Sequence, residues 1–125
     1  MVEVAVIGFG AAGLVATRHL LRCGLRAIVF EGRRYPGGAW STVHDVDGSN
    51  RLKMWDSLST NLSKYTCAFS DYPWADDAPT FASSGHMSRY LEGYADKYVL
   101  NNDDCTVKYG SCALGLKTNF PGPVS

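Results

Sequence analysis

The chain has 125 residues, which is enough for one modest domain with a hydrophobic core but not for two. Twelve basic and twelve acidic residues cancel, so no charge excess points to nucleic acid or to an anionic membrane surface as a partner. Its 46% hydrophobic content argues against wholesale disorder, and its four widely spaced cysteines, without a C-x-x-C, predict buried free thiols in a reducing compartment and no metal site.

The first thirty residues predict a strand, a helix and a second strand. Residues 2–7 are apolar and precede a glycine-rich turn, which indicates a buried strand. Residues 14–23 have helical character, with Arg18 and Arg22 one turn apart on the expected solvent face and Gly24 as a left-handed terminator. Residues 25–30 include the continuous apolar run 27–30, which indicates a strand buried on both faces.

The turn between the first strand and the helix has the pattern of a dinucleotide-binding site. Gly8 permits a tight turn, Gly10 lets a pyrophosphate approach the backbone, and Gly13 lets the helix pack closely on the strand. Glu31, at the end of the second strand, can accept hydrogen bonds from a ribose and would repel a 2′-phosphate, so the ligand should be NAD or FAD rather than NADP. The alternative is an α/β domain with a glycine-rich turn and no ligand.

The middle of the chain carries weaker signals. Residues 35–40 (Tyr-Pro-Gly-Gly-Ala-Trp) form either an ordinary loop or bare backbone beside a flat cofactor ring, and both interpretations stay open. Arg33 and Arg34 are more typical of a solvated loop than of a ligand contact. Residues 43–51 predict a hairpin-like excursion, and the aromatic residues of 65–74 are expected to cover the edge of the core.

A second helix is predicted over residues 86–99. Five apolar residues recur there at helical spacing: Met87, Tyr90, Leu91, Tyr94 and Tyr98. Ser84 or Ser88 is the expected N-cap, and His86 is expected to be structural more readily than a catalytic base. Residues 106–109 indicate a further strand, and residues 110–125 an irregular tail.

Several sequence blocks, in this order, resemble the N-terminal part of the flavin-containing monooxygenases. The blocks are Gly8-x-Gly10-x-x-Gly13, Glu31, Gly37-Gly38-Ala39-Trp40, Ser57-Leu58-Ser59-Thr60-Asn61, Phe69-Ser70-Asp71-Tyr72-Pro73-Trp74 and Tyr90-Leu91-Glu92-Gly93-Tyr94-Ala95. The glycine motif occurs in many flavoproteins, whereas the later blocks are much more specific. The likeness runs from Val2 to about Leu100.

The resemblance implies a set of FAD contacts. The pyrophosphate would be held by the glycine turn, which comprises Gly8, Phe9, Gly10, Ala11, Ala12 and Gly13. Glu31 would hold the adenosine ribose, and residues 38–40 (Gly38, Ala39 and Trp40) would lie along the cofactor. Thr60, Asn61 and Leu62 would sit beside the isoalloxazine ring, where Asn61, the implied catalytic residue, also meets the nicotinamide of NADP. Phe9 stands where the family generally has a small residue.

In this family NADPH reduces the flavin, which then uses O₂ to oxygenate soft nitrogen or sulfur centres of small molecules. The 125 residues contain neither a second glycine-rich motif for NADPH nor the F-x-G-x-x-x-H signature. We therefore expect residues 1–109 to form a partial FAD-binding domain, truncated relative to full-length members, with residues 110–125 as an irregular tail. This chain alone should bind FAD weakly at best and not turn over.

The expected fold is α/β, a Rossmann-like parallel sheet of about three strands flanked by the two helices, with an open edge that is prone to aggregation. The expected setting is cytoplasmic, without a membrane segment, and the oligomeric state is not predicted. Two alternatives remain: a fragment of another two-dinucleotide flavoprotein, such as a Baeyer–Villiger monooxygenase, and a non-catalytic fragment that binds a partner through its open sheet edge.

Overall fold

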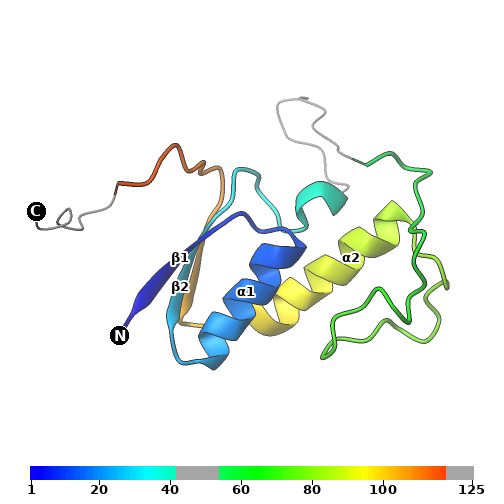
Figure 1. The fold of residues 1–125 in the computed structure, drawn as a ribbon, viewed down its shortest axis with the longest axis horizontal. Helices are drawn as coiled ribbons and strands as arrows, with labels where there is room; N and C mark the ends of the chain where they lie inside the picture. The colour runs from blue at the N-terminus through cyan, green and yellow to red at the C-terminus, as the bar shows by residue number, and fades with distance from the viewer. Residues whose placement is uncertain (42–53, 118–125) are drawn as a thin grey trace, which may run out of the picture.

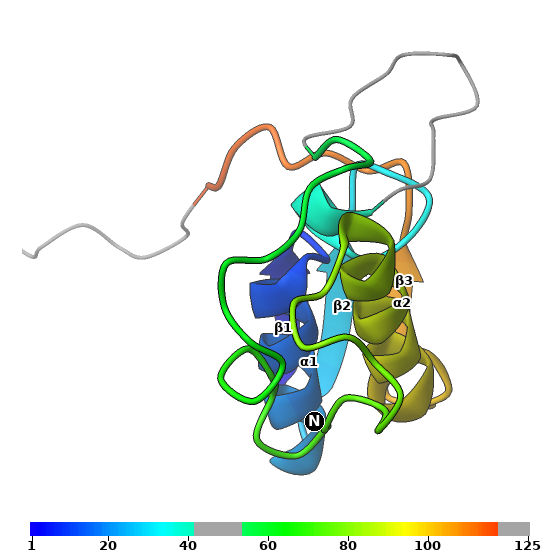
Figure 2. The same ribbon diagram turned by 90° about the vertical axis from the view of Figure 1, so that its right-hand side faces the viewer.

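The computed structural model describes residues 1–41 and 54–117 and shows three parallel strands with two helices on one side (Figures 1 and 2). The elements in chain order are β1 (Glu3–Ile7), α1 (Ala11–Arg22), β2 (Arg26–Phe30), the 3₁₀-helix η1 (Gly38–Trp40), α2 (Ser84–Ala95), the π-helix η2 (Asp96–Leu100) and β3 (Cys105–Lys108). The α/β class and the three-stranded parallel sheet are confirmed. The hairpin expected at 43–51 and the tail from 118 on lie outside the described residues.

The sheet has the order β1-β2-β3, with β2 in the centre. Glu3 of β1 lies opposite Arg26 of β2, and Ala27 of β2 lies opposite Cys105 of β3. The crossover from β1 to β2 runs through α1, as parallel pairing requires. In the part of the chain that the structure describes, no strand pairs with the outer edge of β1, so the expected open edge is present.

One face of this sheet is covered and the other is open among the described residues. Both helices lie on the same face (Figure 2). Ala27 and Val29 are fully buried beneath them, whereas Ile28 and Phe30 are only half-buried. On β1, Ile7 is 63% exposed. The prediction that the run 27–30 is buried on both faces is therefore wrong for the described structure, because both helices cover the same face of the sheet.

Helix α1 begins at Ala11 rather than residue 14 and is followed by Gly24 in the left-handed conformation (φ +72°), which confirms the predicted terminator. Arg22 is exposed as expected, but Arg18 is not on a solvent face. Its guanidinium forms an ion pair of 2.6 Å with Asp71 and lies 3.3 Å from the ring centroid of Tyr98. The sequence pattern correctly predicted that Arg18 belongs to the helix, but it could not show that the 69–74 segment packs over this side chain.

Helix α2 begins two residues earlier than predicted, and its cap is Ser83. The Ser83 hydroxyl oxygen accepts a hydrogen bond of 3.3 Å from the backbone N–H of His86 and lies 2.6 Å from its ring nitrogen Nδ1. Ser84 is the first helical residue, and Ser88 donates to Glu92 (2.8 Å) inside the helix, so neither caps it. After Ala95 the helix widens into the π-helix η2.

In the aromatic 65–74 segment, Phe69, Tyr72 and Trp74 pack against the core as predicted, whereas Tyr65 is 78% exposed. Phe69 lies 4.5 Å from Tyr94, and Trp74 stacks on Tyr90 at 4.2 Å, measured between ring centroids. The Tyr90 hydroxyl accepts from the backbone N–H of Phe69 (2.7 Å) and donates to the carbonyl of Tyr72. One buried hydroxyl therefore closes the Phe69–Tyr72 turn.

We expect Gly93→Ala to destabilise this packing by about 1–2 kcal/mol, because the new methyl group would overlap the Tyr72 hydroxyl. The cost is moderate since the obstacle is the end of a side chain, which can shift. Urea denaturation measures it, and Gly93→Ala combined with Tyr72→Phe should recover most of the loss. Equal destabilisation with and without the hydroxyl would contradict this account.

Candidate functional site

The turn between β1 and α1 requires two of its three motif glycines for its own geometry. Gly8 has φ +91°, and its N–H donates to the carbonyl of Phe30 at 2.8 Å. A Cβ atom at Gly13 would overlap the carbonyl group of Gly8. The tight turn and the close helix-on-strand packing predicted from the sequence are therefore both present.

The first turn of α1 presents backbone N–H groups without a capping side chain. Gly10 is the N-cap, no side chain bonds to the cap position, and no acidic residue lies in the first turn. Ala12 is exposed, and Gly10 and Ala11 are partly exposed, so solvent reaches this helix end. Unpaired N–H groups and the positive end of the helix dipole favour an anion such as a pyrophosphate.

Glu31 is anchored beside this turn. Its side chain is buried, with Oε2 accepting from the backbone N–H of Phe9 at 2.7 Å and Oε1 accepting from that of Arg33 at 2.8 Å. A carboxylate has about four acceptor positions, so each oxygen can accept a further hydrogen bond. The predicted ribose acceptor therefore lies at the glycine turn with its orientation already fixed.

The loop that contains Gly37 and Gly38 packs directly on the glycine turn. The N–H of Gly37 donates to the carbonyl of Phe9 (3.0 Å), and a Cβ atom at Gly38 would lie 2.8 Å from Cα of Gly10. The bare backbone of Gly38 is required for close packing on the chain's own Gly10, and the position of a cofactor ring beside residues 35–40 remains a prediction. Trp40 packs against the core, and Ala39 is exposed.

Arg33 is not merely solvated, in contrast to the sequence-based expectation. Its Nη1 donates to the carbonyl of Gly38 at 2.8 Å, and its own carbonyl accepts from Gly110 at 3.0 Å. Arg33 therefore links Glu31, the loop that contains Gly37 and Gly38, and the segment that follows β3. No sequence period or motif distinguishes Arg33 from its exposed neighbour Arg34, so this role could be found only in three dimensions.

Phe9 fits the turn because its ring is directed into the core. The side chain is fully buried, and its ring centroid lies 6.3 Å from that of Tyr109. Burial raises the pKa of the Tyr109 hydroxyl, and the negative charge of Glu31 raises it further. Phe9 is therefore directed away from the surface of the turn, and its backbone N–H and carbonyl are already bonded to Glu31 and Gly37.

The segment with Thr60, Asn61 and Leu62 is anchored elsewhere. The Thr60 N–H donates to the carbonyl of Ala82 (2.8 Å), while its hydroxyl accepts from Ala82 (3.1 Å) and donates to Leu62 (2.9 Å). Asn61 and Leu62 are exposed. The structure thus brings together the glycine turn, Glu31 and the Gly38 loop, and it holds Thr60 near the start of α2. The cofactor and catalytic roles of these residues remain predictions.

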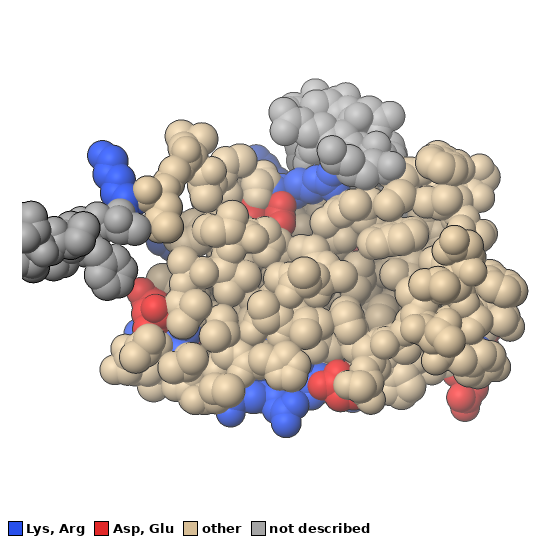
Figure 3. Space-filling view, in the orientation of Figure 1, with Lys and Arg blue, Asp and Glu red and all other residues tan. Residues whose placement is uncertain are grey.

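Other kinds of site find little support in the described residues. Figure 3 shows a face that is mostly uncharged, with acidic and basic side chains near its margins. Residues 1–41 and 54–117 contain no group of three His, Cys, Asp or Glu side chains that could hold a metal. The four cysteines are free as predicted, although Cys23 and Cys112 are exposed rather than buried. No described helix is both long and apolar enough to cross a bilayer.

Comparisons with known proteins identify the family of this chain. The family model described as flavin-binding monooxygenase-like matches residues 1–110. Flavin-containing monooxygenase 3 of Rattus norvegicus is 37% identical over 94 residues, which are 74% of this chain and 17% of the rat protein. The chain thus spans less than a fifth of the length of such relatives.

Solved structures share the fold. S-allyl-L-cysteine S-oxygenase from Allium sativum matches with a TM-score of 0.65 and 30% identity, over 77% of this chain and 25% of that one. A closed structure of cyclohexanone monooxygenase matches with a TM-score of 0.63, over 87% of this chain and 19% of that one. Its identity of 23% shows likeness of fold alone.

Proposed function

Because this chain belongs to the flavin-binding monooxygenase-like family, we propose that residues 1–109 hold the adenosine diphosphate part of FAD. One observation carries this proposal: the uncapped N-terminus of α1 lies beside a buried, fixed carboxylate. The two features match the two chemical parts of the ligand, since pyrophosphate is an anion and a ribose presents hydroxyl donors.

Each residue group has a distinct role in this proposal. The pyrophosphate lies at the turn formed by Gly8, Phe9, Gly10, Ala11, Ala12 and Gly13. The first turn of α1 supplies the N–H donors, because those of Gly8 and Phe9 are bonded to Phe30 and Glu31. Glu31 accepts from the ribose, and Gly38, Ala39 and Trp40 line the cofactor. Thr60, Asn61 and Leu62 flank the flavin ring, where the uncharged amide of Asn61 both donates and accepts hydrogen bonds without supplying an acidic proton. Bound flavin, with NADPH and O₂, would supply oxygenation of soft nitrogen or sulfur centres.

In our proposal this chain alone binds FAD, although less tightly than a longer protein that contains this unit, and does not turn over. Its 125 residues hold a single glycine-rich dinucleotide motif, which the FAD pyrophosphate takes up. A second dinucleotide, the hydride donor, then needs a binding site from residues beyond these. The small-molecule substrate and the NADPH requirement are therefore proposals for a longer protein that contains this unit.

The test is a visible absorbance spectrum after incubation of the purified chain with excess FAD and desalting. We expect the folded chain to retain a flavin band and Glu31→Gln to weaken FAD binding by roughly tenfold, because a charged acceptor for the ribose is lost. Glu3→Gln is the matched control, since Glu3 is an exposed carboxylate at the start of β1.

Two outcomes would overturn the proposal in separable ways. A folded chain that stays colourless, or a Glu31→Gln variant that binds FAD as the parent does, would remove the assigned site and leave the interaction-fragment alternative. Rapid bleaching of a retained flavin band by NADPH would refute only the statement that this chain does not turn over.

A further inference from the structure

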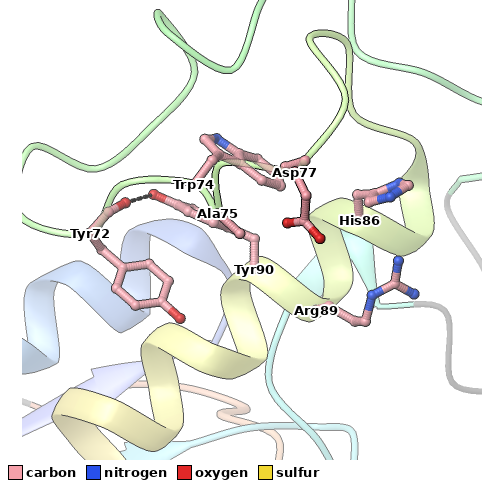
Figure 4. Close-up of a pocket in the computed structure, with 8 residues that line it drawn as sticks. Tyr72, Trp74, Ala75, Asp77, His86, Arg89 and Tyr90 are labelled. Atoms are coloured by element: carbon pink, nitrogen blue, oxygen red, sulfur yellow. Dashed lines mark hydrogen bonds between the residues drawn. The ribbon is translucent and has the colours of Figure 1, made fainter.

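A second candidate site lies between the 72–78 loop and the start of α2, away from the glycine turn. It is a pocket of about 340 Å³ (Figure 4). Its lining includes Trp74, Asp77, His86, Arg89 and Tyr90. None of these residues is assigned to FAD, so an inference about the pocket does not rest on flavin binding.

The aromatic wall of the pocket is held rigidly. Trp74 stacks on Tyr90 with an interplanar angle of 16°, and its indole N–H donates to the carbonyl of Cys67 at 2.7 Å. The Tyr90 hydroxyl is fixed at the Phe69–Tyr72 turn. A preformed wall costs a ligand little ordering entropy, and the face of an indole attracts a cationic group.

The polar lining carries both signs of charge. Asp77 extends from the loop, while His86 and Arg89 extend from α2 toward the same space (Figure 4). Within residues 1–41 and 54–117 the only ion pair joins Arg18 to Asp71, so Asp77 and Arg89 do not neutralise each other. The Nδ1 of His86 is engaged by Ser83, which leaves Nε2 for a ligand.

We propose that this pocket binds a small zwitterion of amino-acid size, with its ammonium group at Asp77 and Trp74 and its carboxylate at Arg89 and His86. An anion alone would meet the charge of Asp77, and a cation alone that of Arg89, whereas a zwitterion satisfies both. The cavity volume lies at the lower end of the range for small-molecule sites, about 300–1,000 Å³, and suits a ligand of this size.

The test follows the indole N–H signal of Trp74 by NMR in the flavin-free chain, with the signal identified by its loss in Trp74→Phe. The probes are L-leucine, its methyl ester, which is only a cation, and N-acetyl-L-leucine, which is only an anion. We expect leucine to shift the Trp74 signal in a saturable way and each singly charged probe to bind roughly tenfold more weakly. Trp55, which is 62% exposed, is an internal control.

Two substitutions separate the charges. Arg89→Gln should weaken leucine binding roughly tenfold, so that leucine binds no more tightly than its methyl ester. Asp77→Asn should likewise make leucine bind no more tightly than N-acetyl-L-leucine. Asp76→Asn and Arg22→Gln should leave binding unchanged, because Asp76 is exposed like Asp77 but does not line this pocket, and neither does Arg22. The proposal is overturned if leucine leaves the Trp74 signal unmoved, or if either charged variant binds all three probes as the parent does.

Discussion

Gly13→Ala is expected to lower the free energy of unfolding by about 3 kcal/mol and to abolish FAD retention. The new methyl group would overlap the carbonyl oxygen of Gly8, and that carbonyl belongs to backbone that cannot move freely. Gly8 is held at φ +91° and bonded to Phe30 of the neighbouring strand. Relief would therefore require α1 to shift away from β1, which would also displace the N–H groups proposed to bind pyrophosphate.

Chemical denaturation and flavin absorbance together measure this effect. The control is Gly24→Ala, at a glycine with φ +72° where an added Cβ atom would meet nothing within 4 Å. That variant should lose only about 1–2 kcal/mol, the cost of a left-handed non-glycine residue, and should keep the FAD site. If Gly13→Ala were as stable as the parent, the close packing of α1 on the turn would be disproved.

Stability should also fall as the pH rises from about 10 to about 12, through deprotonation of Tyr90. Burial raises the pKa of its hydroxyl to about 12, from an ordinary value of 10.0. The folded chain therefore holds this proton more tightly than the unfolded chain. Its contribution is fully present below pH 10, is lost as the pH rises toward 12, and amounts to roughly 2–3 kcal/mol for a shift of this size.

Urea denaturation at a series of alkaline pH values measures this loss. Tyr90→Phe should flatten much of the pH dependence, although burial raises the pKa of Tyr94 as well and some dependence will remain. At neutral pH the same variant should lose about 1–2 kcal/mol, because the N–H of Phe69 loses its acceptor. Tyr65→Phe, at a side chain that is 78% exposed, should behave as the parent. An unchanged alkaline profile in Tyr90→Phe would assign the loss to other groups.

The sequence predicted those parts of the fold that depend on local spacing. The β1–α1–β2 unit, the terminator Gly24 and the position of Glu31 follow from a glycine pattern and an apolar period that act over about thirty residues. The same reasoning could identify the glycine turn, because Gly8 and Gly13 serve local backbone requirements.

The remaining features depend on contacts between distant segments. The contact of Gly38 with Gly10 and the burial of Arg18 under Asp71 arise only when loops fold back on α1. The apolar run 27–30 likewise does not reveal whether helices cover one face of the sheet or both. Ser83 was missed as a cap for a simpler reason, since three serines stand close together at residues 83, 84 and 88 and composition cannot choose among them.

The pairing of β2 with β3 has a consequence for the order in which this chain can fold. β1 and β2 are joined by one short crossover, whereas residues 31–104 separate β2 from β3. Closing the longer loop costs more chain entropy, and parallel pairing at long sequence separation slows folding. The folding nucleus with the lowest contact order is thus the β1–α1–β2 unit that contains the glycine turn. Gly110 bonds to Arg33 beside that turn, and this bond forms only when the long loop closes.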